Sequence, residues 1–404
     1  MTAKILFLTP DLPYPPHQGA AIRTFNLVKH LAPHHELHLL SFAQEGRDPQ
    51  SVGPLSTFCA AIATVPLPVR STKSRALSVL FSTKPDMALR LPSQEFANQL
   101  RICLSRERFD FVQVEGIEMA QYGLAIRQMS LPSRSLLIFD DINAEYLLQR
   151  RAFETDTRQP RLWFSALYSF IQWQKLRRYE AHVCREMDGV VAVSEADRKA
   201  LLGLVPGLRI AVVPNGVDTT YYSPAHGEAE SDMTLVFTGK MDFRPNVDAV
   251  LWFVQEVWSS IRREIPEAQF KIVGRSPHPH LERLRDVPGI TLTGYVKDVR
   301  PHVAGAGVYV VPLRVGGGTR LKVLEAMSMG KAIVCTSLGC EGIDVTPDQD
   351  LLIADEPVAF AKRAVSLMKD GQRRRELGEA ARSLAQARYD WRCIGPLLEQ
   401  VYES

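Results

Sequence analysis

The residues best suited to chemistry lie in a glycine-rich stretch of the C-terminal half of the chain. An apolar run, Val308–Val311, leads into Gly316, Gly317 and Gly318, and a helix is predicted to open near Thr319. Glycines let the backbone approach a ligand closely, and the free N–H groups at a helix start point at it. This arrangement is suited to holding a diphosphate without a metal ion. The alternative is a strand-to-helix turn that binds nothing.

Two cations and a carboxylate follow these glycines. Arg320 and Lys322 fall in the first turn of the predicted helix, where positive charge opposes the helix dipole. A dianionic ligand nearby would relieve that conflict, which makes both side chains candidates for holding phosphate. Glu325, further along the helix, could accept hydrogen bonds from two vicinal hydroxyls of a ribose. The competing interpretation is a set of solvated surface charges.

A second strand end repeats the pattern. The predicted strand Leu235–Thr238 ends in Gly239 and Lys240, and Arg244 and Asn246 precede an amphipathic helix. A lysine at the carboxyl end of a parallel strand faces the ligand crevice and suits a phosphate oxygen. The alternative is a helix-capping loop with a surface lysine.

In the N-terminal half, a proline-rich loop follows the predicted strand Ile5–Leu8. It leads to Gly19 and to a helix that carries Arg23. Binding loops concentrate at such strand ends, so the loop is predicted to lie over a cleft. The alternative is a stiff connection.

A polar cluster follows another predicted strand, Leu136–Phe139. Asp140 and Asp141 come directly after it, and Asn143 and Glu145 complete the cluster. Such groups could bind sugar hydroxyls or hold a proton in flight. They could equally cap the helix that follows, and Asp141 or Asn143 could do either job.

The sequence contains only weak candidates for metal binding. Asp348 and Asp350 form an Asp-x-Asp pair in a polar turn, but no further oxygen ligands can be placed beside them. His278, His280 and His302 lack a fourth partner at ligand spacing. No metal site is therefore predicted.

The stretch Arg161–Glu180 is rich in aromatic and aliphatic residues and ends in Lys175, Arg177 and Arg178. Such a helix could sit at a membrane interface. It could equally pack inside the N-terminal half or in a dimer interface, and packing is the interpretation favoured here.

The elements that must position these motifs alternate between short apolar runs and longer amphipathic ones. This alternation, from Ile5–Leu8 to Leu351–Ala354, predicts an α/β protein with parallel sheets covered on both faces. The polar segment Ser223–Asp232 is predicted to belong to a linker, so we expect two doubly wound, Rossmann-like domains that face each other across a cleft. The length agrees, because 404 residues at about 150 per domain give two or three domains.

Composition narrows the classes of partner. There are 48 basic and 45 acidic residues, a formal net charge of +3, so no broad basic field for nucleic acid is expected. Six scattered cysteines indicate reduced thiols in the cytoplasm. The first apolar run is short for a signal peptide, and no run approaches the ~20 apolar residues of a membrane span. Any membrane contact is expected to be peripheral, at the inner face of the cell membrane.

Taken together, five motifs resemble a family 4 glycosyltransferase of the GT-B fold, in a bacterial subgroup that builds exopolysaccharide or lipid-linked glycans. They are PYPPHQG followed by Arg23, DDINAEY, VVPNGVDTTYYSP, FTGKMDFRPNVDAV, and GGGTRLKVLEAM with GKAIVCTSLGCEG. The resemblance implies an acceptor-binding domain over residues 1–213 and a donor-binding domain over 214–388. A final helix within 389–404 would pack back onto the first domain.

The resemblance also implies roles. The donor would be a nucleotide sugar, the anomeric configuration would be retained, and no metal or other cofactor would be needed. Glu325 matches the glutamate that binds the donor ribose, and Lys240 matches a cation that touches the donor phosphates. Gly274, Arg275, Tyr295 and Val296 fall where the nucleobase is lined. Asp140 or Asp141 lies about where many relatives have a catalytic-pocket histidine.

The implied mechanism needs no enzymic nucleophile. The bond to the diphosphate loosens first, and the amides of 316–319, Lys240 and Arg320 stabilise the leaving group. The acceptor hydroxyl attacks from the same face and passes its proton to a phosphate oxygen.

Two positions depart from the family pattern. The Glu-x7-Glu motif expects a glutamate at position 317, where this chain has Gly317, and a second cation is expected where this chain has Asn246. Arg320, Lys322 or Arg244 could supply the missing charge. Two rival functions stay open: a nucleotide-sugar 2-epimerase of the same fold, and a nucleotide-binding subunit without activity.

Overall fold

The computed structural model describes residues 2–17, 19–44, 52–71, 78–79, 81–130, 134–157, 160–224 and 230–403. They divide into two compact units. The N-terminal unit comprises Met1–Pro214 with Ile394–Ser404, and the C-terminal unit comprises Asn215–Cys393. Each unit is described by itself below.

The N-terminal unit contains a seven-stranded parallel sheet in the order β3-β2-β1-β4-β5-β6-β7. Its strands are nearly continuous apolar runs because helices cover both faces. They are β1 (Lys4–Thr9), β2 (Glu36–Ala43), β3 (Ala61–Pro66), β4 (Phe111–Glu115), β5 (Leu136–Asp141), β6 (Gly189–Ala192) and β7 (Ile210–Val212).

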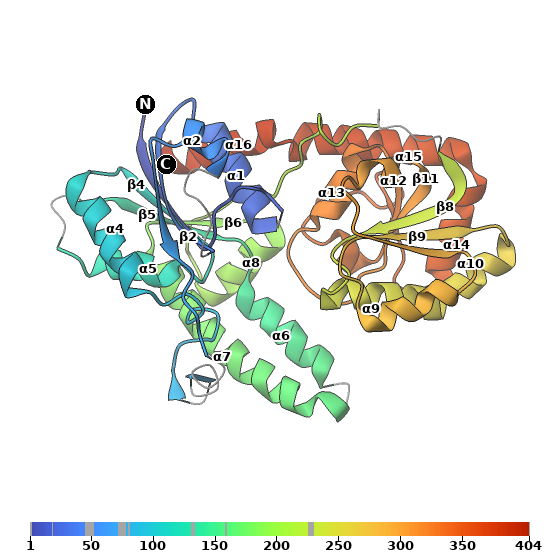
Figure 1. Cartoon of the computed structure of the whole chain (residues 1–404), viewed down its shortest axis with the longest axis horizontal. Coiled ribbons are helices and arrows are strands. Elements are labelled where there is room, and N and C mark those ends of the chain that lie inside the picture. Colours follow the sequence, from blue (N-terminus) through green and yellow to red (C-terminus); the bar gives the residue numbers. More distant parts are fainter. Residues whose placement is uncertain are drawn as a thin grey trace. The chain divides into compact units, whose positions relative to one another are not determined.

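Helices connect these strands, as parallel pairing requires. They are α1 (Gly19–Leu31), α2 (Leu55–Phe58), α4 (Gln94–Arg106), α5 (Ala120–Arg127), α6 (Glu145–Asp156), α7 (Trp163–Glu186) and α8 (Glu195–Leu204). Helices α6 and α7 lie side by side and extend away from the sheet as a long hairpin (Figure 1). Helix α16 (Trp391–Glu403) belongs to this unit from Ile394 onward.

The C-terminal unit contains a six-stranded parallel sheet in the order β10-β9-β8-β11-β12-β13. Its strands are β8 (Ser231–Thr238), β9 (Gln269–Val273), β10 (Ile290–Gly294), β11 (Ala306–Val311), β12 (Ala332–Cys335) and β13 (Leu352–Ile353).

The first helical run of this unit comprises α9 (Arg244–Trp252), a π-helical turn (Phe253–Trp258) and α10 (Ser259–Glu264). The others are α11 (Pro279–Glu282), α12 (Arg300–Ala304), α13 (Leu321–Ser328), α14 (Pro357–Lys369) and α15 (Gly371–Leu384).

The predicted fold class is confirmed: both units are doubly wound α/β layers around a parallel sheet. Some local boundaries differ from the prediction. The helix expected to open near Thr319 begins at Leu321, with Arg320 as its N-cap. Of the predicted linker Ser223–Asp232, residues 225–229 lie outside the described residues, and β8 begins inside it at Ser231.

Both sheets reverse their strand order at one point, between β1 and β4 in the N-terminal unit and between β8 and β11 in the C-terminal unit. Ligands of open α/β sheets bind beside such a point, at the carboxyl ends of the strands. The loops after β8 and β11 therefore meet where a ligand is expected.

Candidate functional site

Backbone hydrogen bonds join the loops that follow β8 and β9 in the C-terminal unit. Gly239 N donates to Val273 O at 3.0 Å, and Met241 N donates to Arg275 O at 2.9 Å. A side chain at Gly274 has no room, because its Cβ would lie 1.7 Å from the carbonyl oxygen of Gly239. Glycine at 274 is thus required for the two loops to approach each other.

Lys322 connects the helix after β11 to the end of β8. Its Nζ donates to Thr238 O at 2.7 Å and to Asn246 Oδ1 at 2.8 Å, and it lies 4.1 Å from the centre of the Phe237 ring. Asn246 in turn donates through Nδ2 to Lys240 O at 2.9 Å. A single ammonium group therefore lies where the two loops of the switch point meet.

The surroundings of Lys322 weaken its hold on a proton. Burial first, and the positive charge of Arg320 next, lower its pKa from the usual 10.5 to about 7, and Glu325 acts against this shift. An anion bound beside Lys322 would favour the charged form of the amine.

The glycine-rich loop packs against the start of α9. Gly316 and Gly318 have φ angles of 103° and 74°, which glycine adopts without strain. A Cβ on Gly316 would lie 3.2 Å from Pro245 Cγ and 3.4 Å from Arg320 Nη2. Arg320 donates to Gly317 O, and the buried Thr319 Oγ1 has no hydrogen-bond partner among the described residues. The loop, α9 and α13 thus form one compact group.

Glu325 lies on the same helix and is paired with a residue that the sequence motifs did not single out. Its carboxylate accepts a hydrogen bond from the Tyr222 hydroxyl. Burial raises the pKa of Glu325, while Tyr222 and Lys322 act against that shift. Ser328 Oγ donates to Tyr222 O at 2.6 Å and holds the tyrosine backbone against α13. The adjacent tyrosines in the stretch TTYYSP were the feature of the sequence that could have indicated this contact.

Other predicted donor-site residues lie at the same edge of the sheet but apart from this group. Lys240 is exposed, with its Nζ 3.4 Å from Asp242, and Arg244 and Arg275 are also exposed. Tyr295, 75% exposed, and Val296 follow β10, which is two strands from β8 and so about 10 Å away. The structure brings together Gly239, Gly274, Gly316, Gly317, Arg320 and Lys322, with Glu325 one helical turn beyond.

In the N-terminal unit, Arg23 and Asp140 are fully buried and bonded to each other. Arg23 donates from Nε to Asp140 Oδ2 at 2.9 Å and from Nη2 to Oδ1 at 3.1 Å. Its Nη1 donates to Val213 O and Pro214 O. This pair joins α1 to β5 and to the end of β7, and the charge of Asp140 is already matched. Gly19 is the first residue of α1.

A second buried carboxyl, Glu115, lies beside this pair and was missed in the sequence. It accepts from Thr24 Oγ1 at 3.1 Å and from Gln113 Nε2 at 3.2 Å. Burial raises its pKa to about 8, and the negative charge of Asp140 adds to the shift. An acidic residue directly after the apolar strand Phe111–Val114 could have indicated it.

The interpretation of Asp141 or Asn143 as a helix cap is wrong. The N-cap of α6 is Ala144, and the cap is supplied from α7: Glu180 accepts from the backbone N–H groups of Glu145 at 2.8 Å and Tyr146 at 2.9 Å. Glu180 is 35 residues from Glu145, so local sequence could not reveal it.

Asp141 instead lies buried against Glu180. Burial, and next the charge of Glu180, raises the pKa of Asp141 well above its usual value. Burial also raises the pKa of Glu180 to about 7, and that of Glu145 to about 8, with Asn143 donating to Glu145 at 3.2 Å. This end of the N-terminal sheet is therefore a place where carboxyls keep protons near neutral pH.

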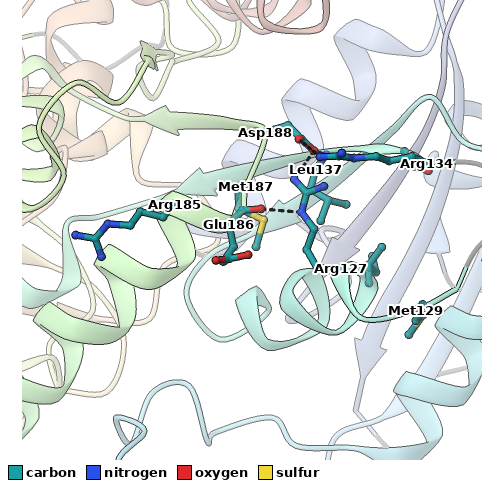
Figure 2. Close-up of a pocket in the computed structure, with 10 residues that line it drawn as sticks. Arg127, Met129, Arg134, Leu137, Arg185, Glu186, Met187 and Asp188 are labelled. Atoms are coloured by element: carbon teal, nitrogen blue, oxygen red, sulfur yellow. Dashed lines mark hydrogen bonds and ion pairs between the residues drawn. The ribbon is translucent and has the colours of Figure 1, made fainter.

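A pocket of about 490 Å³ lies at the opposite, amino end of β5 and β6 (Figure 2). Two of its arginines already have partners. Arg127 and Arg134 lie 2.6 and 3.0 Å from the carboxylate of Asp188, which also accepts from Leu137 N. Because it lies at the end of the strands opposite to the edge where ligands of open α/β sheets bind, this pocket is not the candidate site.

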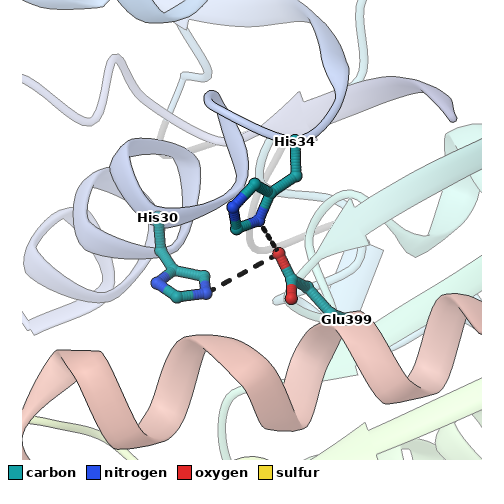
Figure 3. Close-up of side chains that lie close together, drawn as sticks. All are labelled: His30, His34 and Glu399. Atoms are coloured by element: carbon teal, nitrogen blue, oxygen red, sulfur yellow. Dashed lines mark hydrogen bonds and ion pairs between the residues drawn. The ribbon is translucent and has the colours of Figure 1, made fainter. Parts of the chain in front are cut away.

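Side chains that could ligate a metal occur on the N-terminal unit. His30 and His34 both point at Glu399 of α16, with His34 Nδ1 2.5 Å and His30 Nε2 3.7 Å from Glu399 Oε1 (Figure 3). These contacts tie α16 to α1. In the C-terminal unit, Asp348 contacts Arg363, and Asp350 accepts from Thr346 N at 2.7 Å, so both residues of the Asp-x-Asp pair serve the turn itself.

Comparison with known families agrees with the fold. Residues 17–221 match the family model described as Glycosyltransferase Family 4, and residues 232–370 match that of Glycosyl transferases group 1. The chain belongs to glycosyltransferase family 4, and its fold is GT-B.

Two relatives by sequence and one solved structure illustrate what this chain is similar to. A protein of Klebsiella pneumoniae, described as an uncharacterized 44.6 kDa protein in the cps region, is 22% identical over 96% of this chain and 97% of its own length. The phosphatidyl-myo-inositol mannosyltransferase of Mycolicibacterium smegmatis is 28% identical over 54% of this chain and 57% of its own. Anabaena HepE, solved in complex with UDP-glucose, has a TM-score of 0.66 at 14% identity over the full length of both chains.

Proposed function

We propose that this glycosyltransferase moves a sugar from a nucleotide-diphosphate-sugar donor to a hydroxyl of a glycan or lipid-linked acceptor. We propose further that the anomeric configuration is retained and that no metal ion is required. The observation that carries the proposal is the placement of Lys322 between Thr238 and Asn246, beside the glycines of two strand-end loops.

Lys322 supports the donor site because it resolves one departure from the family pattern. Its Nζ lies 2.8 Å from the side chain of Asn246, the position at which a second cation is expected. The charge can thus come from α13 instead of α9. A diphosphate beside Lys322 would gain an ionic hydrogen bond and would restore a full charge on the amine.

The remaining donor contacts follow from the same edge of the sheet. The backbone amides of Gly316, Gly317, Gly318 and Thr319, with Arg320, would stabilise the diphosphate, and exposed Lys240 and Arg244 would approach it from the β8 side. Glu325, held by Tyr222, would accept from the ribose hydroxyls. Gly274, Arg275, Tyr295 and Val296 would line the base.

In the proposed reaction the bond between the anomeric carbon and the diphosphate oxygen breaks, leaving an oxocarbenium-like centre. The cations and amides stabilise the charge that develops on the diphosphate. The acceptor hydroxyl oxygen bonds to the anomeric carbon on the same face, and its proton passes to a phosphate oxygen of the leaving group. These cations supply the positive potential that a metal ion would otherwise provide.

The acceptor is proposed to bind to the N-terminal unit. Asp141 ends β5, where it is buried, and Asn143 and Glu145 follow it. The half-buried Asn143 and Glu145 would offer an amide and a protonated carboxyl to sugar hydroxyls. Asp140 and Arg23 neutralise each other, so their proposed role is to hold α1, which Gly19 starts, against the sheet. The relatives described as a phosphatidyl-myo-inositol mannosyltransferase and as a protein in the cps region support a lipid-linked or glycan acceptor.

The test is a thermal-shift series with UDP, GDP, ADP and their glucose and mannose derivatives. One of them should stabilise the wild-type chain by RT ln(1 + [L]/Kd), about 2.7 kcal/mol at a hundredfold excess over Kd. Lys322→Met should lose the shift. Lys369→Met, at an exposed ion pair of α14 in the same unit, should keep it. An unchanged shift in Lys322→Met would contradict the donor site.

Incubation of the stabilising nucleotide sugar, with and without acceptor glycan, separates the rival functions. Transfer that requires acceptor supports the proposal. A free epimer formed without acceptor would identify a 2-epimerase, and binding without any donor consumption would identify a nucleotide-binding subunit, which the glycine at 317 suggested.

A further inference from the structure

The first half of α7 carries large apolar side chains in the open. Trp163, Phe164, Leu167 and Phe170 are 73%, 91%, 58% and 41% exposed. Trp163, Leu167 and Phe170 follow the i, i+4, i+7 spacing of one helix face, with Phe164 beside them. We call these four residues the apolar face of α7.

The opposite face of the same helix is packed. Ala166, Ser169, Gln172 and Leu176 are buried against the rest of the unit. The earlier expectation that the stretch Arg161–Glu180 packs internally therefore holds for one side of the helix only. The residues that the structure describes do not bury the apolar face in the way that they bury the opposite face of α7.

Charge distinguishes the kinds of partner that this face could accept. Arg177 follows Phe170 by seven residues, two turns along the same face, and Arg177, Arg178 and Arg161 are exposed. The acidic residues Asp156 and Glu180 of the hairpin are buried, and among its described residues, 145–157 and 160–186, the exposed acids are Glu154 and Glu186. Glu154 is bonded to Arg150, and Glu186 lies at the far end of α7.

We propose that the apolar face of α7 docks onto an anionic lipid bilayer. The exposed aromatic and aliphatic side chains enter the boundary between headgroups and acyl chains, while arginines two turns away contact lipid phosphates. Phe170, whose ring also packs against Phe153 and Trp173, lies at the edge of this face. No described helix is long and apolar enough to cross a membrane. The apolar face is suited to lie in the interface and not to span it.

A second copy of the chain fits this face less well. In a symmetric pair whose α7 helices run parallel, Arg177 and Arg178 of each copy would approach their equivalents, and like charges across an interface are costly. The lipid surface has the opposite sign and needs no complementary protein shape. The inference does not rest on the proposed donor chemistry, whose residues belong to the other unit.

The experiment is co-sedimentation of the full chain with vesicles of phosphatidylcholine alone or with phosphatidylglycerol. The wild type should bind the anionic vesicles, and less so at high salt. The double variant Phe164→Ser/Leu167→Ser should bind the anionic vesicles at least about tenfold more weakly than the wild type. Arg177→Gln/Arg178→Gln should lose about fivefold per arginine and most of the preference for anionic lipid. Val358→Ser, at an exposed apolar residue of α14, is the matched control and should bind like the wild type.

Two further readouts complete the test. All variants should keep the nucleotide-dependent thermal shift, because the donor site is in the other unit. Sedimentation velocity without lipid should give the same species for wild type and Phe164→Ser/Leu167→Ser. The proposal would be overturned if the wild type did not bind vesicles, or if Phe164→Ser/Leu167→Ser bound them as well as the wild type. It would also be overturned if the wild type formed a dimer that this double variant dissociates.

Discussion

The two units share one strand order, yet their functional edges have opposite chemistry. Both sheets run third-second-first-fourth-fifth-sixth, and the N-terminal unit adds β7. In the N-terminal unit the strand ends gather buried carboxyls, among them Glu115, Asp140 and Asp141. In the C-terminal unit they gather glycines around the buried amine of Lys322.

This contrast shows that the fold provides a location while the residues at the strand ends decide what is bound. Burial raises the pKa values of Glu115 and Asp141, so these carboxyls keep protons near neutral pH. The amine beside Asn246 has a lowered pKa and so gains from an anion. The same burial pushes the two edges in opposite directions, because desolvation disfavours charge of either sign.

The largest effect is expected from Gly274→Ala. The new Cβ would lie 1.7 Å from Gly239 O, so the loops after β8 and β9 must separate. Urea denaturation should show the C-terminal unit destabilised by about 3 kcal/mol, and nucleotide binding should be lost.

The matched control is Gly203→Ala on α8 of the N-terminal unit, where a Cβ meets nothing within 4 Å. It should stabilise that unit slightly, by up to about 1 kcal/mol, because alanine favours a helix. Equal effects of the two substitutions would mean that the approach of the two loops does not require glycine.

The next effect is the pH dependence of donor affinity. Lys322 with a pKa of about 7 is charged below that pH and neutral above it. Affinity for a nucleotide sugar, measured by calorimetry, should be highest near pH 6. It should fall by up to about tenfold per pH unit above 7, because binding must then take up a proton.

The variant Lys322→Arg carries a charge throughout this range and should give a flat profile, even if its affinity is lower. A wild-type affinity that does not change between pH 6 and 9 would place the titrating amine away from the donor.

The third effect is on stability, and it has opposite signs in the two units. Glu115 has a pKa near 4.5 when unfolded and about 8 when folded, so the folded N-terminal unit holds an extra proton between these values. Its stability should therefore fall as pH rises from about 4.5 to 8, by at most about 1.4 kcal/mol per pH unit for each such group. Lys322 has the reverse effect: it should make the C-terminal unit more stable as pH rises from about 7 to 10.5.

Scanning calorimetry of the wild type and Glu115→Gln checks this expectation. The glutamine mimics the protonated carboxyl and should reduce the slope between pH 5 and 8. The exposed Glu154→Gln serves as control and should leave it unchanged. If the slope of stability against pH is the same in Glu115→Gln as in the wild type, the pH dependence comes from other carboxyls.

Much of the fold could be predicted from the sequence because its signals are local. A short, continuous apolar run such as Val308–Val311 is typical of a strand that is buried on both faces. Three glycines after such a strand indicate a loop. The fold class and the family resemblance were therefore within reach. The roles of the individual site residues remain predictions.

What escaped prediction depends on contacts between distant segments. Lys322 and Asn246 are 76 positions apart, and Glu180 caps a helix that begins 35 residues before it. Tyr222 reaches Glu325 across about a hundred positions. Periodicity specifies which face of an element is buried but not which partner it meets, so these pairs appear only when the elements are packed.

The return of α16 has a consequence for how the protein is made. Ile394 and Leu398 are fully buried, and Tyr402 donates to Gln113 Oε1 at 3.1 Å. Glu399 lies against His30 of α1 and against His34 in the turn that follows α1. These residues leave the ribosome only after the entire C-terminal unit has been translated, a delay on the order of tens of seconds. During that interval the first unit lacks these contacts, so its packing is completed only once α16 has been made.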